Sequence, residues 1–302
     1  MSSEIVFRVA PTEAGVRLDK LIVRHAPGLG RRRAAELFQA GQVQVDGRRA
    51  KKGELGTADS EIRVELGEPD GAAPEPDAPL DVRLERPELV IVSKPAGQPS
   101  VALRGLERGT LAGGLLGHYP EMQALGSPRE AGLIHRLDTF TSGLLLAART
   151  ADAHQRLRRA LAAGELHKRY LAIVAGANLP GSGVIEREIA PHPRDQRRVC
   201  VGEGLRGARA AITEWSVVRR NARWALLEIE APRALRHQIR VHLASIGHPI
   251  AGDTLYGEGP LPELGSRHAL HASHLTWAGD EVLRGFAVTD PLPAELLALV
   301  AD

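Results

Sequence analysis

The sequence predicts an α+β protein with two folded units, on the basis of three observations. The chain of 302 residues is long enough for two domains, one of them with a substantial core. Its composition, 43% hydrophobic and 25% charged, is typical of a globular protein. An acidic, proline-rich stretch separates two segments that both contain strand and helix patterns. We therefore expect a small unit over residues 1–67, a flexible or extended linker over 68–79 and a large unit over 80–302.

The small unit is expected to contain two helices followed by a hairpin. Apolar residues recur at helical spacing over 18–25 and 34–38, and Gly41 can end the second helix. Valines that alternate with polar residues then lead into Asp46–Gly47, the strongest short hairpin signal in the chain. Residues 62–66 supply a closing strand.

The large unit is expected to combine many strands with few helices. Strand patterns occur at 89–92, 144–148, 169–174, 215–218 and 224–229. One helix is predicted over 151–163, with Thr150 as its N-cap and Gly164 as its stop. Many strands with few helices between them indicate a mixed, mostly antiparallel sheet.

Charge and cysteine content restrict the class of protein. The formal net charge is only +2, and Cys200 is the only cysteine, which excludes an intramolecular disulfide and a cysteine metal cluster. The N-terminus lacks the basic and apolar pattern of a signal peptide, and no apolar run approaches the ~20 residues that span a bilayer. We expect a cytoplasmic monomer with no membrane contact.

Basic residues are concentrated in the small unit. Arg31, Arg32 and Arg33 stand at the start of the second predicted helix, where cations oppose the helix dipole. A solvated charged face is one explanation, but beside a helix and a hairpin a phosphate-binding surface is the better one. Four more cations follow the hairpin turn: Arg48, Arg49, Lys51 and Lys52. This arrangement resembles the small RNA-binding domain first named for ribosomal protein S-four.

One segment of the large unit carries the strongest chemical signal. The run His135-Arg136-Leu137-Asp138-Thr139-Phe140-Thr141-Ser142-Gly143 places an acid on a tight turn at the mouth of a buried strand. Catalytic groups commonly occupy loops on rigid scaffolds. The pattern HRLDxxTSG resembles the catalytic motif of the RluA family of RNA pseudouridine synthases.

Other segments match motifs of the same family, in the same order. They are Lys94-Pro95-Ala96-Gly97, Lys168-Arg169-Tyr170, the HQIRVHL run at 237–243, the segment 247–257 and Arg267-His268-Ala269-Leu270-His271-Ala272. Together they cover nearly all of residues 80–302. The resemblance implies the pseudouridine synthase fold, a mixed sheet with flanking helices and a central cleft. One departure is Ala234-Leu235-Arg236, where family members commonly have Gly-Arg-Thr, and it could change how this strand meets RNA.

The resemblance also implies roles for individual residues. Asp138 would be the catalytic residue, Arg240 would pair with it, and Tyr170 would stack on the target base. A carboxylate in a closed pocket needs such a cation to stay charged. Tyr170 could alternatively be an ordinary core tyrosine of a strand.

Further residues are expected to bind the substrate. A uridine in folded RNA must leave its stack to be modified, and Arg136 resembles the residue that fills the vacated space. A structural salt bridge is the alternative role of Arg136. Ile239 should pack against the base, and His135 should orient the loop rather than transfer protons. Thr141 and Lys168 complete the expected substrate-binding set.

The implied reaction is isomerisation of uridine to pseudouridine, with no metal or organic cofactor. Addition of Asp138 and abstraction of a ribose proton both remain open as its first step. The expected substrate is bacterial large-subunit (23S) ribosomal RNA, with transfer RNA as the second choice. Zinc catalysis through His237, His242 and His248 lacks an HExxH motif, and kinase chemistry lacks a glycine-rich loop. A non-catalytic RNA-binding or ribosome-assembly factor is the alternative, against which Asp138, Tyr170 and Arg240 are all present.

Overall fold

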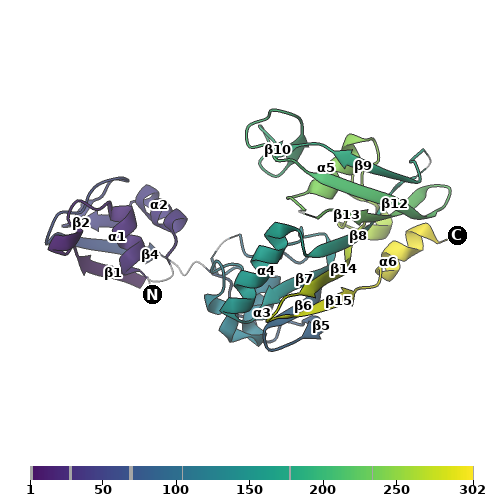
Figure 1. Cartoon of the computed structure of the whole chain (residues 1–302). Coiled ribbons are helices and arrows are strands. Elements are labelled where there is room, and N and C mark those ends of the chain that lie inside the picture. Colours follow the sequence, from purple (N-terminus) through teal and green to yellow (C-terminus); the bar gives the residue numbers. More distant parts are fainter. Residues whose placement is uncertain are drawn as a thin grey trace. The chain divides into compact units, whose positions relative to one another are not determined.

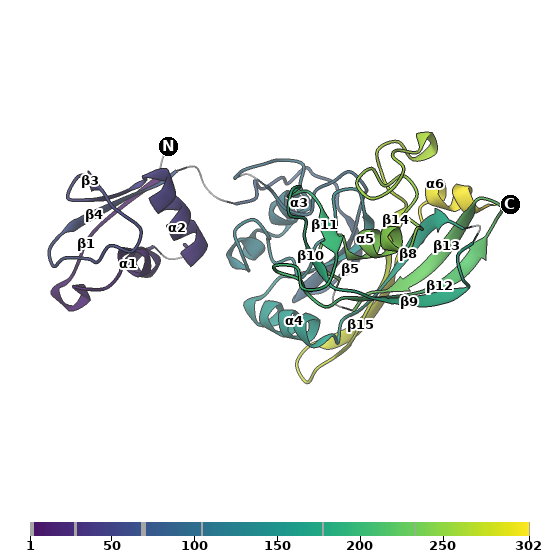
Figure 2. The ribbon, with the colours of Figure 1, turned by 90° about the horizontal axis from the view of Figure 1, so that it is seen from above.

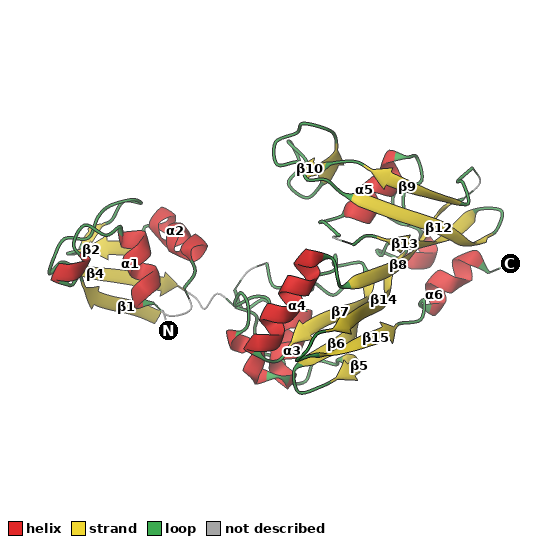
Figure 3. Ribbon diagram, viewed as in Figure 1, coloured by secondary structure: helices red, strands yellow, loops and turns green. Residues whose placement is uncertain are grey.

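The computed structural model describes residues 3–26, 29–67, 71–103, 105–176, 178–232 and 234–301. The chain divides into two compact units, drawn with their elements in Figures 1 and 3. The small unit comprises Met1–Gly71 with Arg104–Leu106, and the large unit comprises Ala72–Leu103 with Glu107–Asp302. Among the described residues, no helix is long and apolar enough to cross a membrane.

The small unit is a four-stranded antiparallel sheet with two helices. Its strands, in the order β1-β4-β2-β3, are β1 (Ser3–Arg8), β4 (Glu61–Gly67), β2 (Val43–Val45) and β3 (Arg48–Arg49). The helices are α1 (Leu18–His25) and α2 (Arg31–Ala40), with a short 3-10 turn at Pro11–Glu13. Asp46 and Gly47 have φ values of 47° and 79°, as a two-residue hairpin turn requires. The predicted helices and the predicted hairpin are therefore confirmed.

The large unit is built on a nine-stranded mixed sheet. The strand order is β5-β6-β7-β14-β8-β13-β12-β9, with β15 paired to β14. The strands are β5 (Asp81–Glu85), β6 (Leu89–Lys94), β7 (Ser142–Ala148), β8 (His167–Ala175), β9 (Ser182–Glu186), β12 (Ile212–Arg220), β13 (Trp224–Glu230), β14 (Leu270–Gly279) and β15 (Arg284–Thr289). Of the pairings between these described strands, only β7 with β14 is parallel. The expected mixed, mostly antiparallel sheet is confirmed.

Two helices pack on opposite faces of β6 and β7. Side chains of a strand alternate between its faces, and both faces of these strands are apolar. One set packs with α3 (Leu111–His118), and the other packs with α4 (Ala151–Ala163). Helix α4 has the predicted ends, since the Thr150 hydroxyl accepts a hydrogen bond from the Ala153 amide and Gly164 is left-handed.

The remaining elements are short and lie mostly in the second half of the chain. They are β10 (Ile189–Pro191), β11 (Val199–Val201), α5 (Gln238–Ser245), α6 (Ala294–Leu297) and 3-10 turns at Pro120–Ala124, Pro262–Leu264 and Ala298–Val300. The description of residues 234–236 as part of a strand was wrong, because they form a turn that leads into α5. Buried apolar residues alone do not separate a short helix from a strand.

The proline-rich segment is not a free linker over its whole length. Ala72 and Ala73 are buried, and the Glu75 amide donates a hydrogen bond to the Gly113 carbonyl in α3. At Gly117 an added Cβ would lie 2.2 Å from the Glu75 carbonyl carbon. Residues 72–79 therefore belong to the large unit, and the boundary falls after Gly71 rather than after residue 79. Residues 68–70 of the predicted linker lie outside the described residues.

The parallel junction of β7 and β14 lies next to the candidate catalytic loop. Ser142 pairs with His271, and Gly143 pairs with Ala272. Gly143 has a φ of 111°, and a Cβ there would lie 2.2 Å from the Ala272 carbonyl oxygen. Only glycine fits this close approach of two backbones. The loop that carries Asp138 thus leads directly into the centre of the sheet.

Candidate active site

Asp138 and Arg240 form the ion pair expected from the sequence. Arg240 Nη1 lies 2.8 Å from Asp138 Oδ2, although 102 positions separate the two residues. The same guanidinium donates from Nε and Nη2 to both oxygens of Asp253, over 2.7 and 2.9 Å. Arg240 is buried, and Asp253 is fully buried. One arginine therefore bridges two carboxylates, of which only Asp138 is partly exposed.

The opposite charges of Arg240 and Asp253 stabilise each other. Burial alone would lower the pKa of Arg240, but its pairs with Asp253 and Asp138 outweigh that effect and raise the pKa. Burial would raise the pKa of Asp253, but hydrogen bonds from Arg240 and from the Leu255 amide lower it. Both groups are therefore charged at neutral pH. Sequence reasoning missed Asp253, although it stands in the matched GDxxYG segment.

Two contacts hold the backbone on either side of Asp138. The Ser100 hydroxyl lies 2.8 Å from the Leu137 carbonyl oxygen. Lys94 Nζ donates to the carbonyl oxygens of Thr139, Pro95 and Gln98 over 2.8–3.0 Å. Burial lowers the pKa of Lys94 to about 7, against the attraction of Asp138. These contacts fix the catalytic loop, and sequence reasoning had assigned Lys94 no role in it.

Tyr170 and Lys168 come from β8, where their side chains share one face. Tyr170 is buried, and burial together with the charge of Asp138 raises the pKa of its hydroxyl, so that it stays protonated. Lys168 is also buried, which lowers its pKa to about 8. Tyr170 packs in the main core cluster, as its alternative role of a core tyrosine expects, and its stacking on a base stays a prediction.

The other predicted substrate contacts differ in accessibility. Arg136 is exposed and forms no ion pair within the described part of the chain, which removes the structural salt bridge as its role. His135 accepts a hydrogen bond from the Leu146 amide over 3.4 Å, and burial lowers its pKa to about 3. Ile239 is 4% exposed and belongs to the main core.

Thr141 does not have the role predicted for it. Its side chain is 2% exposed, and its hydroxyl lies 2.8 Å from His268 Nε2. Its amide donates to the Asp138 carbonyl oxygen. Thr141 therefore supports the catalytic loop and offers no surface to a substrate. The motif could not reveal this, because its partner His268 lies 127 positions away.

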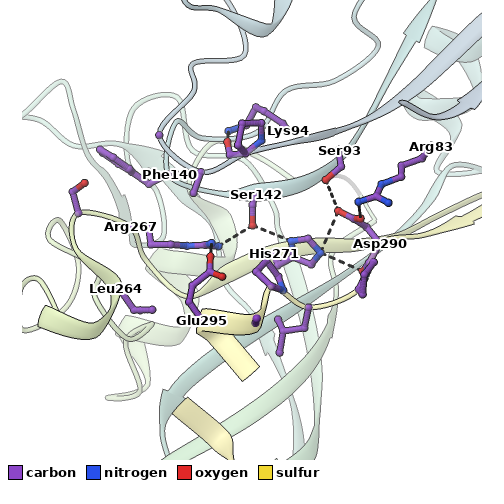
Figure 4. Close-up of a pocket in the computed structure, with 18 residues that line it drawn as sticks. Arg83, Ser93, Lys94, Phe140, Ser142, Leu264, Arg267, His271, Asp290 and Glu295 are labelled. Atoms are coloured by element: carbon purple, nitrogen blue, oxygen red, sulfur yellow. Dashed lines mark hydrogen bonds and ion pairs between the residues drawn. The ribbon is translucent and has the colours of Figure 1, made fainter. Parts of the chain in front are cut away.

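A cavity of about 640 Å³ lies next to this loop, and Phe140 and Ser142 line it but Asp138 does not. Figure 4 shows Arg83, Asp290, His271, Arg267 and Glu295 joined in one network, from which Lys94 lies apart. Arg83 pairs with Asp290, and Arg267 pairs with Glu295 and donates to the Ser142 hydroxyl, which also contacts His271. Since these charges are already paired, we interpret the network as a brace for the β7–β14 junction.

Some of the predicted RNA-binding cations of the small unit form hydrogen bonds or ion pairs within that unit. Arg33 donates to the Leu66 carbonyl oxygen, Arg49 donates to the Gln39 carbonyl oxygen, and Arg48 pairs with Glu54. Lys51 and Lys52 are exposed. The side chains of Arg31 and Arg32 lie outside the described residues. In the described part of the molecule, no group of three histidine, cysteine or acidic side chains is placed to hold a metal ion.

Comparison with known proteins agrees with this geometry. Residues 88–245 match the family model of the RNA pseudouridylate synthases. The chain is 33% identical to ribosomal large subunit pseudouridine synthase D of Xanthomonas campestris, over 97% of this chain and 90% of that protein. It is 34% identical to the protein of the same name from Nitrosomonas europaea, over 95% and 84%.

Solved structures show the same fold. Human RNA pseudouridylate synthase domain containing 1 superposes with a TM-score of 0.58 at 23% identity, over 74% of this chain and 89% of that one. Human RNA pseudouridylate synthase domain containing 4 gives 0.56 at 22% identity, over 72% and 90%. From its family match, its relatives and its fold, the chain belongs to the RluA family of RNA pseudouridine synthases.

Proposed function

We propose that this isomerase acts on large-subunit ribosomal RNA and uses Asp138 as its catalytic residue. The bridge from Asp253 through Arg240 to Asp138 supports the second part of the proposal, because it holds the Asp138 carboxyl group by an arginine at a partly exposed position. The substrate is supported by the relatives from Xanthomonas campestris and Nitrosomonas europaea, whose names specify the large ribosomal subunit.

The geometry gives each group a task in the reaction. Asp138 Oδ2 is bound to Arg240, which leaves Oδ1 for the extruded nucleotide. The bond between the ribose carbon and N1 of the uracil breaks, the base turns, and the same carbon bonds to C5. The proton on C5 is released as N1 takes one up, so no oxidant or reductant is needed. Both addition of Asp138 and abstraction of a ribose proton require its charged form.

Tyr170 would hold the extruded nucleotide, and Arg136 would fill the space that the nucleotide leaves in the base stack. Tyr170 remains protonated and uncharged, so its ring can lie against the uracil without repelling Asp138. Arg136 is exposed and unpaired among the described residues, and its planar guanidinium can occupy the space that the uridine leaves.

The small unit would add affinity for structured RNA. Its fold of two helices and a hairpin agrees with an S-four-like domain, and Lys51 and Lys52 are exposed beside the hairpin. Cations of this kind contact phosphates and give affinity with little sequence information. The Lys51→Gln/Lys52→Gln protein should therefore bind RNA more weakly, with a smaller dependence on salt.

The test is release of tritium from RNA labelled at uridine C5. Large-subunit ribosomal RNA should release tritium, and transfer RNA should release none at equal concentration. Asp138→Asn should abolish the release. Release from transfer RNA alone would overturn the substrate. No release from any RNA together with tight RNA binding would favour the non-catalytic assembly factor.

A further inference from the structure

We propose that His237 and Tyr256 act as positioning residues that orient the Asp138 carboxylate and link it to the arginine-rich hairpin β10–β11. This inference rests on the proposed catalytic role of Asp138. Neither residue was assigned a role by the motif comparison. Both contribute side chains to the surroundings of Asp138 and Arg240, and both are held by contacts described below.

His237 has an unusual backbone conformation immediately before α5. Its φ of 55° and ψ of 15° are left-handed, although it is not a glycine. Such a conformation is strained in a residue other than glycine and persists where the surroundings enforce it, frequently at functional sites. This conformation accompanies a position in which Nε2 lies 3.7 Å from Asp138 Oδ1.

Tyr256 fixes which ring nitrogen of His237 carries the proton. The Val199 amide donates to the Tyr256 hydroxyl oxygen over 2.8 Å, and that oxygen lies 2.9 Å from His237 Nδ1. The hydroxyl proton is then best used by donation to Nδ1, which leaves the ring proton on Nε2. Burial lowers the pKa of His237 to about 4, against the attraction of Asp138, so the ring is neutral.

The two carboxylate oxygens of Asp138 therefore have different neighbours. Arg240 binds Oδ2, and the Nε2–H of His237 faces Oδ1 at a distance that is longer than a hydrogen bond. The terminal torsion of an aspartate is broad, so a carboxylate bound at one oxygen keeps rotational freedom. A second polar group at the other oxygen restricts this rotation. It thereby fixes which face of the Asp138 carboxylate is presented to the ribose.

The hairpin β10–β11 is joined to both members of this pair. Val199, the donor to Tyr256, is the first residue of β11, and the Arg198 guanidinium lies 5.2 Å from the Tyr256 ring centroid. Arg236, immediately before His237, donates to the Arg197 carbonyl oxygen over 2.6 Å. Val199 also packs in an apolar cluster with Val241 of α5, and Figure 2 shows the hairpin beside that helix.

The turn of this hairpin exposes cations that suit a phosphate backbone. Arg194 and Arg197 are exposed between β10 and β11, and the Arg197 guanidinium also pairs with Asp195 of the same turn. We call the contacts that lead from Tyr256 through His237 to Asp138 the relay. RNA bound at this turn would act on Val199, whose amide donates to Tyr256, and on Arg236, which directly precedes His237. Binding at the hairpin is therefore coupled to the orientation of Asp138, in contrast to binding at Lys51 and Lys52.

Tyr256→Phe tests the relay, since it removes one oxygen and keeps the ring. We expect kcat to fall ~10- to 100-fold, the range for a misplaced catalytic group, with KM for RNA within about twofold. Tyr119→Phe, which changes a buried tyrosine that packs with α3, should keep wild-type kcat. Wild-type kcat in Tyr256→Phe would overturn the proposal.

Two variants of His237 separate positioning from folding. Asparagine tolerates left-handed backbone but is too short to reach Asp138, so His237→Asn should fold and lose kcat to a similar extent. Glutamine carries an amide N–H near the position of Nε2, so His237→Gln should recover part of the kcat. Equal kcat for His237→Asn and wild type would contradict the role.

Nitrogen NMR determines which ring nitrogen of His237 carries the proton, and it needs no activity measurement. Among the 12 histidines, the signals of His237 are those missing from His237→Asn. The wild type should show the Nε2–H form, and Tyr256→Phe should show a mixture. An Nδ1–H form in the wild type would refute the relay, whereas activity of Asp138→Asn would refute the proposed function and leave this result intact.

Two double variants test whether the hairpin β10–β11 is coupled to the relay. Arg194→Gln/Arg197→Gln should raise KM and also lower kcat, because the hairpin supports the relay. Lys51→Gln/Lys52→Gln should raise KM alone. If the hairpin variant changes only KM, the relay is not coupled to RNA binding at that turn.

Discussion

Arg240 and Asp253 form a two-point ion pair in which the carboxylate is fully buried, and this pair presents the third nitrogen of the arginine to Asp138. Planar guanidinium and carboxylate groups match in this geometry, which sets direction as well as charge. The orientation of the Arg240–Asp138 pair is thus determined by a residue that is fully buried. Asp253 is a positioning residue for Arg240.

Replacement of Asp253 by asparagine should damage both folding and activity. It would leave Arg240 in a buried position with only Asp138 as its carboxylate partner, and breaking a buried pair costs roughly 3–5 kcal/mol. Denaturant titration followed by tryptophan fluorescence would measure this loss in the large unit, which contains all three tryptophans. Glu295→Gln breaks the pair of Arg267 with a more exposed partner and should cost less. Equal losses in the two variants would contradict the assignment.

Arg240→Lys should retain the charge but lose catalysis. Lysine is a point charge and cannot make the two-point pair with Asp253 while also reaching Asp138. Loss of a hydrogen bond to a charged group costs ~1.5–3 kcal/mol, which corresponds to a fall in kcat of roughly 10- to 100-fold. Single-turnover rates of tritium release would measure it. A rate within twofold of wild type would show that charge alone is sufficient.

Arg136→Ala should separate activity from stability. Arg136 is exposed and has no ion pair among the described residues, so its loss should change the free energy of unfolding by no more than about 0.5 kcal/mol. Tritium release should nevertheless fall by at least about tenfold if the guanidinium fills the vacated stack. RNA with an abasic neighbour or an unpaired target should be less affected, because less stacking has to be replaced.

The pH dependence of stability should reveal His268. Burial lowers the pKa of His268 to about 4, so the folded protein keeps it neutral while the unfolded chain takes up a proton near 6.5. Between these values the unfolded state binds more protons, and the free energy of unfolding falls as the pH falls, by up to about 1.4 kcal/mol per pH unit. The stability is fully present above pH 6.5.

His268→Asn should therefore show a shallower loss of stability between pH 6.5 and 4.5 than the wild type. It should also be less stable at pH 7.5, because Thr141 loses the partner of its hydroxyl. His167→Asn, which changes an exposed histidine, is the control and should keep the wild-type slope. Parallel curves for His268→Asn and wild type would contradict the expectation.

The sequence predicted those features that depend on neighbouring residues. Thr150 and Gly164 mark the ends of α4, and Asp46–Gly47 marks the hairpin, because caps and turns are set by local chemistry. Motif order also led to Asp138 and Arg240. These two are brought together by folding, but the family pattern already linked them.

Features that depend on distant contacts were not predictable from one sequence. Asp253, Tyr256 and His268 act through partners on other elements, and nothing in their local pattern shows which side chain they meet. Residues 72–79 have the composition of a linker, yet they are held because Gly113 and Gly117 leave room for their backbone. Helix α5 was not predicted, because its buried residues Gln238 to Leu243 form a continuous run and show no distinct helical face.

The pairing of Gly143 with Ala272 has a consequence for synthesis of the chain. During translation the segment that bears Asp138 emerges well before β14, its parallel neighbour, which is among the last strands to appear. Until β14 has docked, β7 lacks its parallel neighbour, and the loop that bears Asp138 lacks the support of this junction. We therefore expect the nascent chain to have no activity until the C-terminal strands have docked.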